Sequence, residues 1–324
     1  MRAIIQPRYG GPESVEFRDV HVPELKAGQV LVRNLASSVN AADCETLRGF
    51  ALVRMASPFR PAARIAGSDV AGVVERVAPG VTELAPGDEV MGDLSMHGFG
   101  AFAEYVAAPL EALCRKPAEL TMDQAAAVPT AAWVAIKGIR NQRQLGPDSA
   151  VLVNGGGGSM GTFAIQMARA RGAHVTGVDS AAKLELMHAL GAERVIDYRA
   201  EDPTLLAERF DLVLDVFARR SVRDWRRILK PDGAYLMVGG STRRIIAGFA
   251  LGTALSRKGG QKLGLLYGWP HTRQDMDEVN ELLTSGAMRP AIDRVYPLEQ
   301  TAAALRRLED GLALGKVVIS IEGS

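Results

Sequence analysis

The chain has 324 residues, a net charge of +1, 47% hydrophobic residues and 23% charged residues. This composition is typical of a globular enzyme of roughly two domains, and the near-neutral charge gives no reason to expect nucleic acid or an anionic membrane as a partner. Cys44 and Cys114 are the only cysteines, which argues against a disulfide framework or a four-cysteine zinc site. The cysteine usage fits a reducing cytoplasm, and the N-terminal residues lack a signal-peptide pattern, so we expect a cytoplasmic protein.

Residues 1–122 are predicted to form short strands separated by glycine and proline turns. GQVLVRNLASSV and VAGVVERVAPGV alternate apolar and polar positions, and PGDEVMG continues with a further turn and strand. Short alternating strands with many turns predict a small β-rich barrel or sandwich.

Strands and helices alternate in residues 123–266. Buried strands are predicted in SAVLVNG, AHVTGVD, RVIDY, DLVLDV and AYLMVGG, with helical patterns between them. This alternation predicts an α/β fold with a doubly wound parallel sheet and helices on both faces. Residues 267–324 end with an amphipathic helix and a strand, and we expect them to return to the first region.

A run of glycines follows the first of these strands, in VLVNGGGGSMGTFAIQMARARG. Gly156, Gly158 and Gly161 fit the pattern G-x-G-x-x-G between a predicted strand and a predicted helix. The first glycine allows the tight turn, the second lets a diphosphate approach, and the third lets helix and strand pack closely. The backbone amides of this turn, those of Ser159 and Met160 included, would face the phosphates. The pattern predicts a dinucleotide site rather than a merely flexible turn.

The residues after the second strand favour different coenzymes. Asp179 ends that strand about 20 residues after the first glycine, where the fingerprint places an acid that binds a free ribose and favours NAD. Ser180 and Lys183 would instead suit a 2′-phosphate and favour NADP. Repulsion between Asp179 and that phosphate could reach about 4 kcal/mol at ~4 Å, and Lys183 would offset much of it. On these residues alone both coenzymes stay open, as does an interpretation as solvated loop charges.

Several stretches together resemble the medium-chain dehydrogenase/reductase superfamily, specifically its zinc-free quinone oxidoreductase branch. They are SSVNAAD, AGSDVAGVVERVAPGVTELAPGDEVMG, GAFAEYVAAP, AAAVPTAAWVA, GGGGSMGTFAIQMARARGAHVTGV, LGAERVIDY and GKVVIS. The resemblance runs nearly end to end. It implies a GroES-like catalytic domain at residues 1–122 and a Rossmann domain at residues 123–266, with residues 267–324 returning to the catalytic domain. It also implies a nicotinamide in the cleft between the domains, and a dimer or a tetramer, of which we expect the homodimer.

The resemblance also bears on metal binding and on the reacting groups. Zinc-dependent alcohol dehydrogenases of the same superfamily carry a cysteine where this chain has Asn40 and a histidine where it has Ser68. An amide and a hydroxyl make a poor tetrahedral zinc site, so no metal is expected. Asn40 is instead implied near the nicotinamide and substrate as a donor to the developing oxyanion, with Asp43 on the same segment. Thr130 matches the family threonine beside the nicotinamide ribose.

Further coenzyme contacts are implied at the ends of the predicted strands. Tyr198 matches the tyrosine that surrounds the 2′-phosphate together with a lysine and a serine in NADPH-using members. With Ser180 and Lys183 this favours NADP(H), and NAD(H) is the alternative. The contacts implied on the nicotinamide side are Phe217, Val238, Gly239 and Gly240.

We therefore predict NAD(P)H-dependent, zinc-independent hydride transfer to a quinone or an α,β-unsaturated carbonyl. The alternatives are an enoyl-thioester (acyl-CoA) reductase, an alcohol dehydrogenase-like enzyme, and a cofactor-binding regulatory protein without activity. The basic residues considered for the CoA phosphates are Arg243, Arg244, Arg257 and Lys258. Tyr267 and His97 are candidate proton donors only. The apolar segment Ile245–Leu255 is too short to cross a bilayer, and we expect it to wall the substrate cleft or to form a subunit contact.

Overall fold

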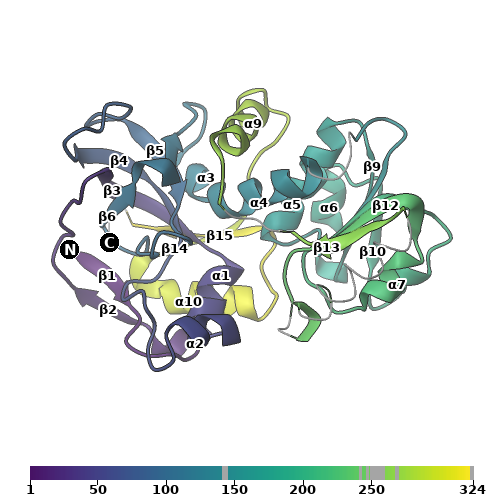
Figure 1. Cartoon of the computed structure of the whole chain (residues 1–324), viewed down its shortest axis with the longest axis horizontal. Coiled ribbons are helices and arrows are strands. Elements are labelled where there is room, and N and C mark those ends of the chain that lie inside the picture. The colour runs from purple at the N-terminus through teal and green to yellow at the C-terminus, as the bar shows by residue number, and fades with distance from the viewer. Residues whose placement is uncertain (141–144, 241–242, 246–247, 249–259, 267–269, 322–324) are drawn as a thin grey trace. The chain divides into compact units, whose positions relative to one another are not determined.

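A computed structural model of the chain describes residues 1–140, 145–240, 243–245, 248, 260–266 and 270–321 (Figure 1). The chain forms two compact units. Unit 1 consists of Met1–Ala131 and Pro290–Ser324, and unit 2 consists of Ala132–Arg289. The mixed α/β fold with a parallel sheet and a β-rich unit confirms the predicted fold class.

Unit 1 is built around a seven-stranded sheet in the order β14-β15-β3-β4-β5-β7, with β6 also paired to β3. Its strands are β3 (Gln29–Val39), β4 (Asp69–Val77), β5 (Glu89–Asp93), β6 (Tyr105–Pro109), β7 (Leu113–Arg115), β14 (Ile292–Pro297) and β15 (Lys316–Ser320). A separate pair joins β1 (Arg2–Ile5) to β2 (Glu16–Asp19). The helical elements are η1 (Pro12–Ser14), α1 (Ala41–Arg48), α2 (Ala51–Ala56), η2 (Leu110–Ala112), α3 (Met122–Ala126), η5 (Leu298–Gln300) and α10 (Thr301–Glu309).

The pairing of β15 with β3 positions a buried lysine of unit 1. The strands are antiparallel, and Val317 lies opposite Val39. Lys316 therefore enters the sheet beside the end of β3, although the two strands are far apart in the sequence. Alternating apolar residues of β3 and β4 pack into the buried core of this unit.

Unit 2 contains a six-stranded parallel sheet in the order β10-β9-β8-β11-β12-β13. Its strands are β8 (Ala150–Asn154), β9 (His174–Asp179), β10 (Arg194–Asp197), β11 (Phe210–Asp215), β12 (Leu229–Met237) and β13 (Lys262–Leu265). Its helical elements are α4 (Pro129–Arg140, which begins in unit 1), α5 (Ser159–Ala170), η3 (Ala181–Lys183), α6 (Leu184–Ala189), η4 (Pro203–Leu205), α7 (Val222–Arg226) and α9 (Arg273–Thr284). The chain runs outward from β8 in both directions, so the strand order reverses between β8 and β11, where open α/β sheets bind their ligands.

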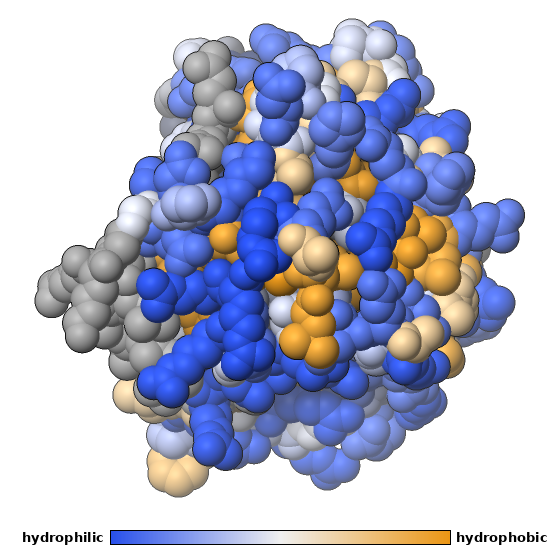
Figure 2. Space-filling model, turned by 90° about the vertical axis from the view of Figure 1, so that its right-hand side faces the viewer, coloured by the Kyte–Doolittle hydropathy of each residue, from blue (hydrophilic) through white to orange (hydrophobic). Residues whose placement is uncertain are grey.

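Helices cover this sheet as the sequence pattern predicts. α5 packs on β8 and β9, α6 packs on β9 and β10, and α7 packs on β12. The core around them includes the fully buried Trp225, Tyr235 and Phe210. Hydrophilic side chains cover most of the side shown in Figure 2, with smaller hydrophobic patches between them.

The predicted boundary after residue 266 is too early. α9 belongs to unit 2 because its buried Asp275 pairs with two basic residues of α4, Lys137 at 3.4 Å and Arg140. The return to unit 1 begins only at Pro290. Within the described residues, no helix combines the length and apolar character needed to cross a bilayer.

Candidate functional site

The glycine-rich loop connects β8 to α5 at the point where the strand order reverses. Gly155 makes the left-handed turn with φ +82°, whereas the sequence pattern assigned the turn to Gly156. A Cβ at Gly156 would lie 2.6 Å from the sulfur of Met187, and one at Gly161 would lie 2.1 Å from the carbonyl oxygen of Gly155. The internal packing of the loop therefore requires both of these glycines.

Gly158 differs because the packing of the loop does not require it. It is the N-cap of α5, and a Cβ there would come no nearer than 3.4 Å to the Gly155 carbonyl oxygen. The first N–H groups of an α-helix lack intrahelical acceptors, and the dipole makes that end positive. α5 begins at Ser159, so the Met160 and Gly161 amides lie at this end. A bare backbone beside a helix N-terminus fits a diphosphate.

The carboxylate of Asp179 turns back toward the glycine loop. Its Oδ2 accepts from the Gly157 N–H at 3.1 Å, and its Oδ1 accepts from the Ser180 N–H at 2.8 Å. Lys183 Nζ lies 3.7 Å from Oδ1, and the side chains of Asp179 and Lys183 are only 12% and 11% exposed. Asp179 therefore anchors the loop and has its countercharge beside it, which weakens the repulsion expected against a 2′-phosphate.

The predicted 2′-phosphate residues gather at the ends of β9 and β10. The Tyr198 N–H donates to the Asp179 carbonyl at 3.1 Å, which places Tyr198 beside Ser180. The guanidinium of the exposed Arg199 lies 5.5 Å from the centre of the Tyr198 ring. The sequence prediction did not include Arg199, although it directly follows the tyrosine that was identified.

The ends of β11 and β12 bring together the residues predicted on the nicotinamide side. The Ala218 N–H donates to the Gly239 carbonyl at 3.2 Å, and Ala218 forms a parallel bridge with Gly240. Val238 directly follows β12, and Phe217 is 56% exposed at the end of β11. These residues border the same edge of the sheet as the glycine loop because all the strands are parallel.

A buried carboxyl lies beneath this edge. Asp215 accepts hydrogen bonds from Asn154 Nδ2 at 2.7 Å and from the Tyr235 hydroxyl at 2.8 Å. Burial raises the pKa of Asp215 to about 6, against the lowering effect of these hydrogen bonds. The contacts tie β8, β11 and β12 together next to the loops that are predicted to bind the coenzyme.

Unit 1 contains a buried polar cluster formed by Ser38, Asn40, Asp43, Ser68, Asp69, Thr130 and Lys316. Asn40 caps α1, and its backbone N–H donates to Asp43 Oδ2 at 2.7 Å. Its side-chain Nδ2 donates to Asp69 Oδ2 at 2.8 Å and to Ser68 Oγ at 3.1 Å, while its Oδ1 accepts from Lys316 Nζ at 2.6 Å. Both N–H groups of the amide therefore donate to other side chains of the cluster.

This geometry does not support the expected role of Asn40 as an oxyanion donor. The amide would have to release Ser68 or Asp69 before it could donate to a substrate oxygen, and Asn40 is buried. The structure instead makes Asn40 the link between Lys316 and Asp69.

Asp69 is the centre of the cluster. Its Oδ1 accepts from both the backbone N–H and the hydroxyl of Thr130, at 2.9 Å and 2.7 Å. Its Oδ2 accepts from the Ser38 hydroxyl and lies 3.2 Å from Lys316 Nζ, and Asp69 and Lys316 are both 0% exposed. The sequence prediction included neither of them; the available signal was a charged residue at the start of each of two apolar strands.

Asp43 is the second carboxyl of the cluster. Its Oδ1 is buried and has no hydrogen-bond partner among the described residues, while Oδ2 also receives the Ser68 hydroxyl at 3.3 Å. Burial, reinforced by the negative charge of Asp69, raises the pKa of Asp43 to about 8. Burial therefore favours the protonated form of Asp43 over the carboxylate.

Comparison with known proteins places the chain in a family. Residues 26–118 match the family model described as an alcohol dehydrogenase GroES-like domain, and residues 190–319 match that described as a zinc-binding dehydrogenase. The 2-methylene-furan-3-one reductase of Solanum lycopersicum is 31% identical over 98% of this chain and 79% of its own length. The chain belongs to the medium-chain dehydrogenase/reductase superfamily, in its quinone-oxidoreductase-like branch.

Two further relatives of this medium-chain reductase agree with that placement. The NADPH-dependent alkenal/one oxidoreductase of Arabidopsis thaliana chloroplasts is 30% identical over 98% of this chain and 79% of its own length. The solved structure of the quinone oxidoreductase from Coxiella burnetii has a TM-score of 0.88 at 26% identity and covers 99% of both chains.

The donor set of this medium-chain reductase does not suit zinc. Asn40 and Ser68 hydrogen-bond each other, and Lys316 places an ammonium group beside them. Across the part of the chain that the structure describes, no group of three or more His, Cys, Asp or Glu side chains is arranged to hold a metal ion. Cys44 and Cys114 are buried and form no disulfide, and burial raises the pKa of Cys44.

The remaining predicted residues lie outside this site or outside the described chain. His97 is exposed in a turn of unit 1. Tyr267, Arg257, Lys258 and most of Ile245–Leu255 lie outside the described residues.

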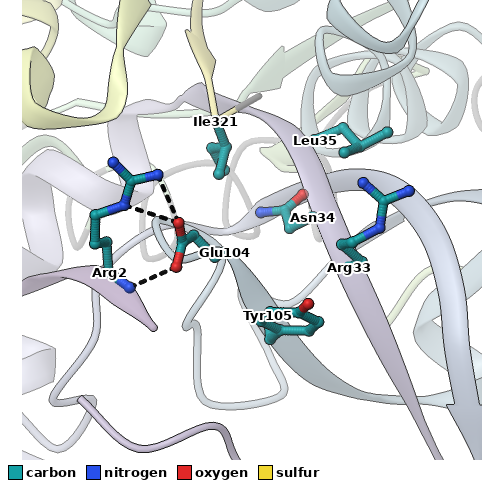
Figure 3. Close-up of a pocket in the computed structure, with 7 residues that line it drawn as sticks. All are labelled: Arg2, Arg33, Asn34, Leu35, Glu104, Tyr105 and Ile321. Carbon is teal, nitrogen blue, oxygen red and sulfur yellow. Dashed lines mark hydrogen bonds and ion pairs between the residues drawn. The ribbon is translucent and has the colours of Figure 1, made fainter. Parts of the chain in front are cut away.

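A surface pocket of about 290 Å³ in unit 1 is lined by none of the predicted site residues (Figure 3). Its lining residues are Arg2, Arg33, Asn34, Leu35, Glu104, Tyr105 and Ile321. The Arg2 guanidinium and the Glu104 carboxylate lie 2.7 Å apart and neutralise each other. Asn34 Nδ2 donates to the carbonyls of Ala101 and Ala103, so its amide N–H groups are used in hydrogen bonds to the backbone.

Proposed function

We propose that the chain catalyses NAD(P)H-dependent reduction of a quinone or an α,β-unsaturated carbonyl by hydride transfer. The observation that carries the proposal is the glycine loop, in which Gly158 leaves bare backbone beside the N-terminus of α5 without being needed for packing. The names of the relatives, an alkenal/one oxidoreductase, a furanone reductase and quinone oxidoreductases, supply the substrate classes.

The bound coenzyme supplies the hydride, and the residues of the chain bind and orient it. The loop from Gly155 to Gly161 would hold the diphosphate, and the ends of β11 and β12 would border the nicotinamide side. The hydroxyl of Thr130 would meet the nicotinamide ribose. Hydride transfer depends mainly on holding the donor carbon against the acceptor carbon with water excluded, and it needs no charged catalytic group. The reduced substrate then takes up its proton from solvent.

NADPH is the coenzyme that we favour. Asp179 is committed to the loop and paired with Lys183, so it presents less negative charge to a 2′-phosphate than a free acid would. Ser180 and Tyr198 lie at the same strand ends, and Arg199 adds a second cation there. Cations and hydroxyls in this arrangement favour a phosphate over a free ribose hydroxyl.

We also propose that the reaction is independent of zinc. The ammonium of Lys316, buried within the cluster, would repel a second cation placed beside Asn40 and Ser68. Metal analysis of the purified protein, with activity measured before and after a chelator, tests this directly. Zinc bound in equal amount to the chain, or activity lost to the chelator and restored by zinc, would overturn it.

We also propose that the chain forms a homodimer and that it is located in the cytoplasm. β13 lies at the end of the six-stranded order among the described strands, and an edge strand offers unpaired backbone groups to a second copy. Light scattering on the purified chain measures the oligomer, and a monomer at micromolar concentration would exclude the dimer.

Steady-state oxidation of NADPH against matched panels tests the function. Quinones and enones form one panel, enoyl-CoA thioesters a second, and simple alcohols with NADP⁺ a third. We expect turnover with the first panel only. Turnover confined to the thioesters or to the alcohols would favour the other enzyme classes, and coenzyme binding without any turnover would favour a regulatory protein.

A further inference from the structure

The ammonium of Lys316 lies inside the polar cluster and not at the surface. Its Nζ donates to Asn40 Oδ1 at 2.6 Å and to Asp69 Oδ2 at 3.2 Å, and all three residues are buried. A buried ion pair is costly to form, and apolar side chains of similar volume often stabilise a fold equally well. The charge therefore points to a role besides stability.

The contacts of Asp69 determine which role it takes in hydrogen bonds. Groups that can only donate surround both carboxylate oxygens: the Thr130 N–H faces Oδ1, and the Asn40 amide and the Lys316 ammonium face Oδ2. Because these three groups can donate but cannot accept, both oxygens of Asp69 act as hydrogen-bond acceptors toward them. The Thr130 hydroxyl, whose oxygen lies 2.7 Å from Oδ1, must then donate its hydrogen to Asp69.

We propose that Lys316 is a positioning residue for coenzyme binding: its ammonium keeps Asp69 a hydrogen-bond acceptor, and Asp69 holds the Thr130 hydroxyl so that its oxygen accepts from the coenzyme ribose. Thr130 lies beside that ribose in the proposed function, on which this role of Lys316 rests. With its hydrogen committed to Asp69, the hydroxyl presents only lone pairs to a ligand. A ribose hydroxyl can donate to them.

Removal of the ammonium has a defined consequence. Lys316→Met keeps a long unbranched side chain but leaves Asp69 and Asp43 without a cation in the cluster. An unpaired buried carboxylate takes up a proton in preference to remaining charged. A protonated Asp69 can donate, and the Thr130 hydroxyl then loses its fixed direction.

Titration of the full chain with NADPH, followed by nicotinamide fluorescence, measures the effect. We expect Lys316→Met and Thr130→Val each to raise the Kd for NADPH roughly tenfold, the loss of one hydrogen bond. The double variant should bind no more weakly than either single variant, because both changes remove the same contact. Thr130→Ser, which keeps the hydroxyl, should bind as the wild type does, and so should the control Lys26→Met at an exposed position.

The pH dependence separates positioning from a purely structural role. Raising the pH favours a carboxylate over a carboxyl, so it should recover affinity in Lys316→Met but not in the double variant, which lacks the Thr130 hydroxyl. Wild-type affinity in a folded Lys316→Met chain would overturn the proposal. So would a double variant whose Kd for NADPH rises by the product of the two single-variant factors.

A second variant keeps the test decisive if Lys316→Met does not fold. Lys316→Met combined with Asp69→Asn removes both charges, and we expect it to recover the fold while binding NADPH as weakly as Thr130→Val. Wild-type affinity in this folded chain would show that the pair is only structural. If the wild type itself does not bind coenzyme, the proposed function is contradicted. If the wild type binds coenzyme and turns over but the variants keep its NADPH affinity, only the role of Lys316 is contradicted.

Discussion

Gly158→Ala separates the needs of the fold from the needs of the coenzyme. A Cβ at this position would meet the Gly155 carbonyl oxygen at 3.4 Å, an ordinary contact, and Gly158 has extended backbone that alanine also adopts. We therefore expect the free energy of unfolding to change by less than about 1 kcal/mol. The added methyl group would occupy the side of the loop that a diphosphate approaches. Overpacking of this kind costs about 1–3 kcal/mol, so NADPH should bind roughly 5- to 150-fold more weakly.

The matched control is Gly161→Ala, in the same loop. Its Cβ would lie 2.1 Å from the Gly155 carbonyl oxygen and 2.7 Å from Gly156 Cα, and neither backbone atom can move cheaply. This variant should lose about 3 kcal/mol of stability, or more, before any coenzyme is added. Calorimetric titration with NADPH and thermal unfolding of both variants give the two quantities separately. A folded Gly158→Ala chain that binds NADPH with wild-type affinity would refute the assignment of the loop.

Two further predictions concern charged residues. Lys183→Met keeps the aliphatic stem against Gly157 but removes the cation. We expect it to weaken NADPH binding roughly 10- to 100-fold and NADH binding much less, and we expect the control Lys26→Met to bind both as the wild type does. Equal weakening of the binding of both coenzymes would contradict the phosphate contact. Burial raises the pKa of Asp43 to about 8 in the folded chain, and the unfolded value is about 4, so the folded state binds this proton more tightly. The contribution of Asp43 to stability is complete below about pH 4 and is lost as the pH rises through about 8, a loss on the order of 5 kcal/mol. Urea unfolding at about pH 5 and about pH 9 should show a smaller decline for Asp43→Asn than for the wild type, and parallel declines would show that Asp43 does not carry the proton.

The strand, glycine turn and helix of the candidate coenzyme site could be predicted from the sequence because their signals are local. A strand, a glycine turn and a helix follow one another, and Asp179 ends the next strand at the expected distance. The residue that makes the turn was assigned wrongly, to Gly156 in place of Gly155, because consecutive glycines offer equivalent turn positions and only the packing against Met187 distinguishes them. Arg199 was not predicted because its position depends on the pairing of β10 with β9.

The polar cluster of unit 1 could not be predicted from local patterns. Lys316 and Asp69 meet only because β15 pairs with β3 and β3 pairs with β4. Asn40 was identified by resemblance, but its role depends on distant partners. Ser68 and Asp69 take up both of its amide hydrogens, and Lys316 donates to its amide oxygen. The boundary of unit 2 was missed for the same reason, since the ion pairs of Asp275 place α9 on α4.

The central claim is that this chain transfers a hydride directly from a nicotinamide coenzyme to a carbon of its substrate. NADPH deuterated at both hydrogens of the nicotinamide C4 is incubated with the chain and an enone, and the product is examined by NMR. We predict one deuterium at the carbon β to the carbonyl and a solvent hydrogen at the α carbon. Product that carries no deuterium, or deuterium found only in the solvent, would contradict the account.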